Sequence, residues 1–385
     1  MYLKRRSFLR PALITFVLAS LFLTACGSRI GNESWPGLST DGEKLYLANG
    51  TTVYSYFADS QKLAWTSPAE PQANQLFYAA PSVEGDRVII GDYGVAGNIL
   101  SLSPGVKVSV YALENVDDGG TAPEEWLQTA DFNDKIVAPP LQVEDTVYIG
   151  TADNFVFALD ARDGSPLWSF ETGHSIWGQP AYHNGVLLVT SMDRSIYALD
   201  AESGADLWQT SFDGAIAAGP VLNEDLVYIA DFDSQVHALD IQTGEEQWAA
   251  PANNWVWGAP SYADGVVYYA DIEGNIFAVD ALSGEAIWNA KSPGAVQTSP
   301  VVAGEIVYVA SEGESSEVPV GALRAFSVED GRELWTTIAP APLFTSPVVV
   351  DDAVIVALQS DVAMLIAYDR NTGGQLWTIA PPSDE

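Results

Sequence analysis

Apolar residues along most of this chain come in short runs that alternate with polar ones, and residues 220–240 show the arrangement clearly. Two runs rich in β-branched and aromatic residues, at 226–230 and 235–240, are bounded by Asn, Asp and Ser. Period-two alternation between such residues is typical of β-strands joined by tight turns. After residue 28 no stretch keeps a helical period for more than a turn or two, so the sequence predicts an all-β protein.

The same unit recurs about every 40 residues and is marked by the pattern A-x-[DS]-x-x-x-G-x-x-x-W. Its six clear copies carry Gly164 and Trp168, Gly204 and Trp208, Gly244 and Trp248, Gly284 and Trp288, Gly331 and Trp335, and Gly373 and Trp377. Trp65 and Trp126 fit two earlier, degenerate copies. Prolines open eight units at positions 36, 81, 140, 180, 220, 260, 300 and 347. The repeats therefore predict an eight-bladed β-propeller of four-stranded antiparallel blades over residues 36–380, followed by a tail at 381–385.

Each residue of the repeated pattern has a structural explanation. The glycine suits a turn that needs a positive φ, and the aspartate can accept hydrogen bonds from its own turn backbone. The tryptophan is large and flat and fits the wedge between neighbouring blades, where its N–H can reach a carbonyl oxygen. We therefore expect the tryptophans and glycines to be docking positions rather than catalytic residues.

The first 28 residues have the organisation of an export signal. Four basic residues lie within residues 1–10, an apolar run follows at 11–23, and the sequence then reads Leu-Thr-Ala-Cys-Gly around Cys26. The apolar run is shorter than the roughly 20 residues of a membrane-spanning helix. The ending resembles a bacterial lipobox, so we expect a lipoprotein signal peptide at 1–25, lipidation of Cys26 and a lipidated tether at 26–35. The Arg-Arg pair at 5–6 fits either a twin-arginine signal or an ordinary basic segment, and both readings stay open.

Composition removes several function classes. The chain has 51 acidic and 16 basic residues and a formal net charge of −35, so a nucleic-acid-binding surface is not expected. Its single cysteine rules out intramolecular disulfides and cysteine-rich metal sites. The charge favours cationic partners or a high-salt habitat, and composition does not choose between these.

The repeated A-x-D-x-x-x-G-x-x-x-W pattern resembles the tryptophan-docking repeat of the quinoprotein-type, or PQQ-like, β-propellers, and the resemblance covers residues 36–380. Together with the lipobox, it is most similar to the BamB family of lipoproteins of the outer-membrane β-barrel assembly machinery. That resemblance implies a monomeric, lipid-anchored, extracytoplasmic scaffold that binds proteins.

The same resemblance also includes PQQ-dependent dehydrogenases, which commonly use a pair of adjacent cysteines, a tryptophan floor and Ca²⁺. This chain has no cysteine pair, and His174, His183 and His237 fall in three different repeats. We therefore expect no catalytic residues and no cofactor or metal. An oxidoreductase using PQQ or a metal, or a ligand sensor, is the alternative.

Two sets of connections should meet at one end of the propeller channel: those between blades, and those between the second and third strands of each blade. Aromatic and acidic residues gather in these connections, and we expect them to form a mouth that binds a partner or ligand: Trp177, Trp255, Trp257, Phe344, Asp193, Asp231, Asp233 and Asp271. A channel plug with a solvated acidic rim is the other interpretation.

Two long insertions, at 93–107 and 313–321, should lie on the same face, where insertions often carry function. A third, at 117–125, should lie on the opposite face and be merely flexible.

Overall fold

The computed structural model describes residues 35–72, 75–94, 108–129, 132, 134–314 and 319–382, and their regular secondary structure is entirely β-strand. Cys26, the expected signal peptide and nearly all of the tether lie outside the described residues, as do the centres of the insertions at 93–107 and 313–321. Within the described part of the chain, no helix is long and apolar enough to cross a membrane.

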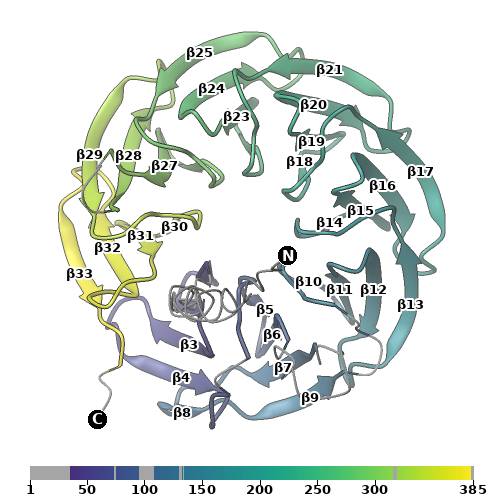
Figure 1. Ribbon diagram of the computed structural model, residues 1–385, viewed down its shortest axis with the longest axis vertical. Helices are drawn as coiled ribbons and strands as arrows, with labels where there is room; N and C mark the ends of the chain where they lie inside the picture. The colour runs from purple at the N-terminus through teal and green to yellow at the C-terminus, as the bar shows by residue number, and fades with distance from the viewer. Residues whose placement is uncertain are drawn as a thin grey trace, which may run out of the picture. The chain divides into compact units, whose positions relative to one another are not determined.

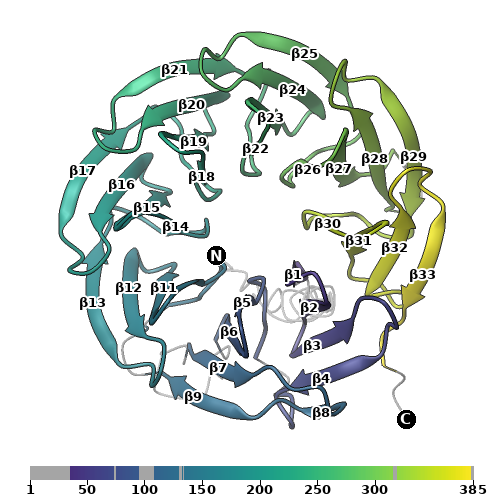
Figure 2. The same cartoon turned by 180° about the vertical axis from the view of Figure 1, so that it is seen from behind.

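Eight antiparallel sheets are arranged radially around a central axis, as Figures 1 and 2 show from the two faces. The first strand of each blade lies nearest this axis and the fourth lies at the circumference. The predicted eight-bladed propeller is therefore confirmed. Each blade takes its main strands from one continuous stretch of chain.

Blades 1 to 4 consist of β1(Gly37–Thr40), β2(Lys44–Asn49), β3(Thr52–Phe57) and β4(Leu63–Ser67); β5(Ser82–Glu84), β6(Arg87–Gly91), β7(Val110–Glu114) and β9(Glu124–Gln128); β10(Leu141–Val143), β11(Thr146–Gly150), β12(Phe155–Asp160) and β13(Pro166–Glu171); and β14(Ala181–His183), β15(Val186–Ser191), β16(Ser195–Asp200) and β17(Asp206–Ser211).

Blades 5 to 8 consist of β18(Val221–Leu222), β19(Leu226–Ala230), β20(Gln235–Asp240) and β21(Glu246–Pro251); β22(Ser261–Ala263), β23(Val266–Ala270), β24(Asn275–Asp280) and β25(Ala286–Lys291); β26(Val301–Ala303), β27(Ile306–Glu312), β28(Gly321–Ser327) and β29(Glu333–Ala339); and β30(Val348–Val350), β31(Ala353–Ala357), β32(Leu365–Asp369) and β33(Gln375–Ile379).

Neighbouring blades are joined through the repeated tryptophan and glycine. The indole nitrogen of Trp168 in blade 3 donates a hydrogen bond to the carbonyl oxygen of Ala201 in blade 4, at 3.1 Å. The ring lies against Gly204, which has a φ of 72° that few other residues adopt. Asp200 accepts hydrogen bonds from the backbone and side chain of Ser203 and so shapes the same turn. The tryptophans at 126, 208, 248, 288 and 335 repeat this hydrogen bond to the following blade.

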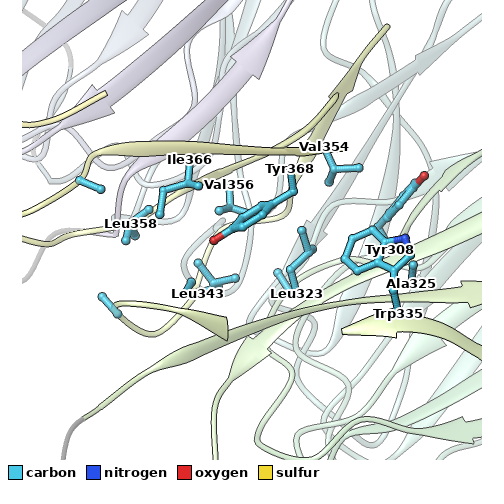
Figure 3. Packing of buried hydrophobic residues seen from close by; sticks show 14 residues of the cluster. Tyr308, Leu323, Ala325, Trp335, Leu343, Val354, Val356, Leu358, Ile366 and Tyr368 are labelled. Atoms are coloured by element: carbon cyan, nitrogen blue, oxygen red, sulfur yellow. The ribbon is translucent and has the colours of Figure 1, made fainter. Parts of the chain in front are cut away.

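Apolar side chains fill the space between blades. In Figure 3, Tyr308, Leu323 and Trp335 of blade 7 lie against Val354, Ile366 and Tyr368 of blade 8. A similar cluster at the seam where the chain ends meet contains Leu45 of blade 1 and Leu365 of blade 8. Because the two blades exchange no strand in the described structure, side-chain packing closes the ring.

The insertion at 117–125 is structured, so the expectation that it is merely flexible is wrong. Its β8(Gly120–Thr121) pairs in parallel with the outer edge of β4 and adds a fifth strand to blade 1. Gly119 N–H donates to the Ala64 carbonyl oxygen at 2.8 Å, and Ala122 N–H to that of Thr66 at 2.9 Å. Backbone pairing with a neighbouring blade orders this segment, and no local pattern signals that pairing.

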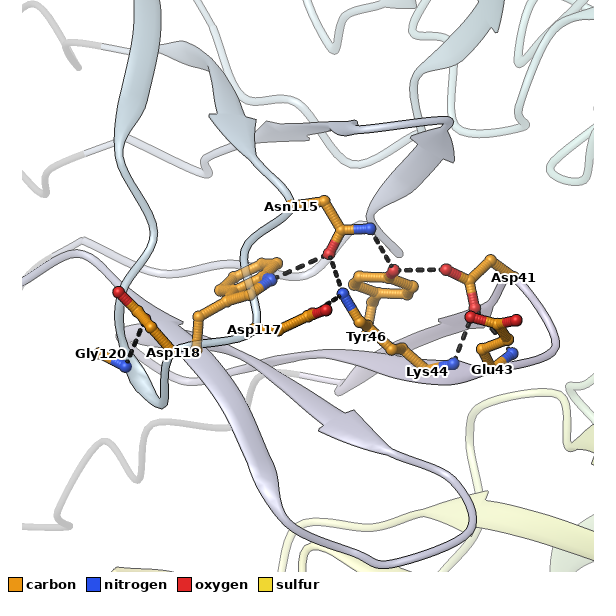
Figure 4. A network of polar contacts seen from close by, with 9 residues as sticks. Asp41, Glu43, Lys44, Tyr46, Asn115, Asp117, Asp118 and Gly120 are labelled. Atoms are coloured by element: carbon orange, nitrogen blue, oxygen red, sulfur yellow. Dashed lines mark hydrogen bonds and ion pairs between the residues drawn. The ribbon is translucent and has the colours of Figure 1, made fainter.

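Asn115 lies at the base of that insertion and connects blades 1 and 2 (Figure 4). Its Oδ1 accepts hydrogen bonds from the indole nitrogen of Trp65 and from Lys44 Nζ, each at 3.1 Å. Its Nδ2 donates to the Tyr46 hydroxyl at 2.8 Å. In this blade a side-chain oxygen therefore replaces the backbone carbonyl that receives the tryptophan N–H elsewhere.

Candidate functional site

The connection from blade 5 to blade 6 is hydrogen-bonded to two turns. One turn follows the second strand of blade 5, and the other follows the second strand of blade 6. Val256 N–H donates to the Asp231 carbonyl oxygen at 3.3 Å, and Ile272 N–H donates to that of Trp255 at 3.0 Å. Val256 is buried in the core, and the residues on either side of it are more exposed. This alternation leaves the side chains of Trp255 and Trp257 free to contact groups outside the blade core.

Four aromatic rings from three connections form a continuous cluster, which we call the aromatic mouth: Trp177, Phe232, Trp255 and Trp257. Phe232 stacks on Trp255 with ring centroids 5.4 Å apart and on Trp257 at 5.1 Å. The ring centroids of Trp177 and Trp257 are 6.3 Å apart. Trp177 belongs to the connection from blade 3 to blade 4, and Trp257 to the connection from blade 5 to blade 6. The connection between them carries Ala217 at the equivalent position, and this small side chain leaves room for the two indoles to meet.

Sequence reasoning missed Phe232, which lies between Asp231 and Asp233 in the turn after β19. No local pattern marks it, because its importance depends on the rings of the next connection. Phe344, by contrast, was expected at the mouth but pairs with Trp35, at 6.4 Å between ring centroids. The structure does not place it among the four rings of the aromatic mouth.

Two of the expected mouth carboxylates are not part of an exposed rim. Asp231 is 1% exposed and Asp271 is 0% exposed. Asp231 Oδ1 accepts hydrogen bonds from the backbone N–H groups of Asp233 and Gln235, at 3.0 and 3.1 Å. Asp271 accepts one from Asn253 N–H at 3.1 Å, which holds the connection that carries the two tryptophans. Because a buried carboxylate is stable only when it is hydrogen-bonded, these residues fix the shape of the mouth.

Asp193 has a similar positioning role and Asp233 does not. Asp193 Oδ2 accepts hydrogen bonds from Gly173 N–H at 2.6 Å and from the Tyr197 hydroxyl at 2.5 Å. Burial and this hydrogen bond to Asp193 raise the pKa of Tyr197 to about 12. Asp233 is exposed at the tip of its turn, beside Phe232. It therefore keeps a negative charge available next to the aromatic rings.

Of the three histidines, His237 has the most enclosed surroundings. It is 7% exposed, and its Nδ1 lies 2.8 Å from Glu246 Oε2. His174 Nδ1 accepts a hydrogen bond from Ser175 N–H, and His183 contacts the Asn184 amide. Among the described residues, no group of three His, Cys, Asp or Glu side chains is arranged to hold a metal ion.

The mouth does not fit PQQ, a planar quinone that carries three carboxylates. A planar cofactor needs cations for its carboxylates and a place between aromatic rings, but Phe232 already stacks on both Trp255 and Trp257. Asp233 and Glu273 are exposed in the neighbouring turns, and these carboxylates would repel those of the cofactor.

Comparison with known proteins gives one family and several structures. The family model described as outer membrane protein assembly factor BamB matches residues 117–178, 171–254 and 249–380. The structure is similar to BamB from Moraxella catarrhalis, with a TM-score of 0.63 and 18% identity over 89% of this chain and 93% of that chain.

It is also similar to the computationally designed Ika8 protein, with a TM-score of 0.67 and 14% identity over 90% of this chain and 97% of that one. A europium-containing methanol dehydrogenase has a TM-score of 0.63 and 14% identity over 79% of this chain and 78% of that chain. At these identities the structural likenesses show the fold alone. Comparison with curated protein sequences finds no significant match.

Proposed function

Because the chain belongs to the BamB family of outer membrane protein assembly factors, we propose that it is a lipid-anchored scaffold that binds partner proteins. The scaffold is non-catalytic and extracytoplasmic, and in a cell with two membranes it serves the assembly of outer-membrane proteins. The lipobox ending at Cys26 supports the anchor.

The observation that carries this proposal is the exposure of Trp255. Trp255 is 48% exposed, yet it is held in place by stacking on Phe232 and by its carbonyl oxygen, which accepts a hydrogen bond from Ile272 N–H. Rigid, exposed tryptophans lose little conformational entropy on binding and are enriched among the residues that dominate protein interfaces. The aromatic mouth is therefore the proposed centre of the interface.

Crosslinking in native membranes tests the interface. A photoreactive residue in place of Trp255 should give a discrete crosslinked partner, and the same residue in place of Leu207 should not. Leu207 is the matched control, because it is 51% exposed but lies on the outer strand β17. Equal labelling at the two positions would contradict a specific interface at the mouth.

Membrane fractionation tests the anchor separately. Cys26→Ala should release the folded protein from membranes, whereas Cys26 in the unaltered chain should keep it there. Retention of the Cys26→Ala protein would overturn the lipid-anchor proposal and leave the interface proposal standing.

A further inference from the structure

His237 in blade 5 and Arg324 in blade 7 occupy the same position of the repeat. Each precedes the alanine that pairs with the docking tryptophan, Ala238 with Trp248 and Ala325 with Trp335. The two side chains therefore project from equivalent positions of their blades, and the residues around one have counterparts around the other.

Arg324 is buried, and its guanidinium is enclosed by neutral acceptors. Nη1 donates to Ser292 Oγ at 2.9 Å and to the Pro293 carbonyl oxygen at 3.2 Å, and lies 3.4 Å from Ser311 Oγ. Its Nε lies 3.9 Å from Glu333 Oε2. Blade 7 thus fills this site with a cation from its own third strand.

Blade 5 has the same site with a shorter side chain and more negative charge. The residues equivalent to Pro293, Ser311 and Glu333 are all acidic here: Asp213, Asp231 and Glu246. Imidazole does not extend as far as guanidinium, and an open cavity of about 710 Å³ lies over it. Four acidic residues line that cavity: Asp213, Asp231, Asp233 and Glu246. Among its described lining, the basic residues are Arg194 and His237.

The buried Nε2 of His237 provides a second, independent observation at this cavity. Glu246 can only accept, so Nδ1 carries the hydrogen directed at it. That Nε2 lies 3.5 Å from Asp231 Oδ2 and has no hydrogen-bond partner among the described residues. A buried polar atom without a hydrogen bond is an unfavourable arrangement, and a cation in the cavity would be attracted to the neighbouring Asp231 carboxylate.

From this geometry we infer that the cavity between blades 4 and 5 binds the guanidinium of an arginine side chain presented by a partner protein. Arg324 is the internal template: the partner's arginine takes the place that blade 7 fills by itself. Asp213, Asp233 and Glu246 supply the charge, and the Phe212 ring, 4.3 Å from the His237 ring, supplies an aromatic wall. The inference rests on the proposed function only for the source of the arginine.

Saturation-transfer NMR on the full-length protein in detergent, at low salt, measures this binding directly. The probe is a capped Gly-Arg-Gly peptide, and the neutral isostere Gly-citrulline-Gly is its control. The arginine peptide should bind saturably, and Glu246→Gln should weaken it about fivefold by removing one charged contact. The matched variant Glu333→Gln, at the filled site of blade 7, should leave the affinity unchanged.

His237→Arg provides a test that does not depend on removing charge. This substitution should place a guanidinium in the cavity from within, as in blade 7, and abolish peptide binding while the thermal unfolding midpoint is kept. Equal binding of the citrulline peptide, equal effects of Glu246→Gln and Glu333→Gln, or unchanged binding by His237→Arg would each overturn the inference. None of these results depends on the Trp255 crosslink or on Cys26, so failure here and failure of the scaffold proposal are distinguishable.

Discussion

The six-membered ring of Trp168 lies against the Cα of Gly204 in the next blade, where an added Cβ would come within 2.7 Å of two ring carbons. The same residue has a φ of 72°. Two separate constraints therefore require glycine at one position: the left-handed backbone of the turn and the close approach of the docking tryptophan.

Gly204→Ala should lower the free energy of unfolding by about 3 kcal/mol, since it adds a steric clash to the strain of a left-handed alanine. Gly185→Ala is the control, because Gly185 has a φ of 86° but no atom within 4 Å of an added Cβ. This variant should lose only about 1 kcal/mol. Urea unfolding measures both changes, and equal losses would show that the tryptophan contact adds nothing.

Asn115→Ala should destabilise the protein by about 2–3 kcal/mol. The substitution removes the acceptor of the buried Trp65 N–H and of Lys44, and the donor to Tyr46, all within the contact between blades 1 and 2. Thermal unfolding checks this loss. Asn371→Ala, at an exposed turn, should change stability by no more than about 0.5 kcal/mol, and a similar shift in both variants would contradict the connecting role of Asn115.

Stability should fall as the pH rises from about 10 to 12, through the buried tyrosines. Burial raises the pKa of Tyr368 from 10.0 to about 12. Its hydroxyl is neutral in both states below pH 10, but between the two values only the unfolded chain loses the proton, so unfolding becomes more favourable. Tyr368→Phe keeps the ring and removes this ionisation.

Urea unfolding at pH 9 and pH 11 measures the effect. The unaltered protein should lose more stability between the two conditions than Tyr368→Phe does, and absorbance at 295 nm should show late ionisation of the folded state. An identical pH dependence in both proteins would remove Tyr368 as a source of alkaline instability.

Local patterns in the chain determined the propeller. The runs at 226–230 and 235–240 became β19 and β20, because strand alternation and turn residues are properties of a few consecutive positions. The repeated Gly and Trp fixed the number of blades for the same reason, since each copy marks one turn and one outer strand.

Tertiary structure alone decided which side chains meet. Trp177 reaches Trp257 only because Ala217 lies between their connections, Phe232 joins them from another turn, and Asp231 and Asp271 are buried rather than exposed. The pairing of β8 with β4 and the contrast between His237 and Arg324 also depend on neighbouring blades. A local sequence pattern specifies strands and turns, whereas contacts between blades depend on how the closed ring brings distant segments together, and so only the fold could reveal them.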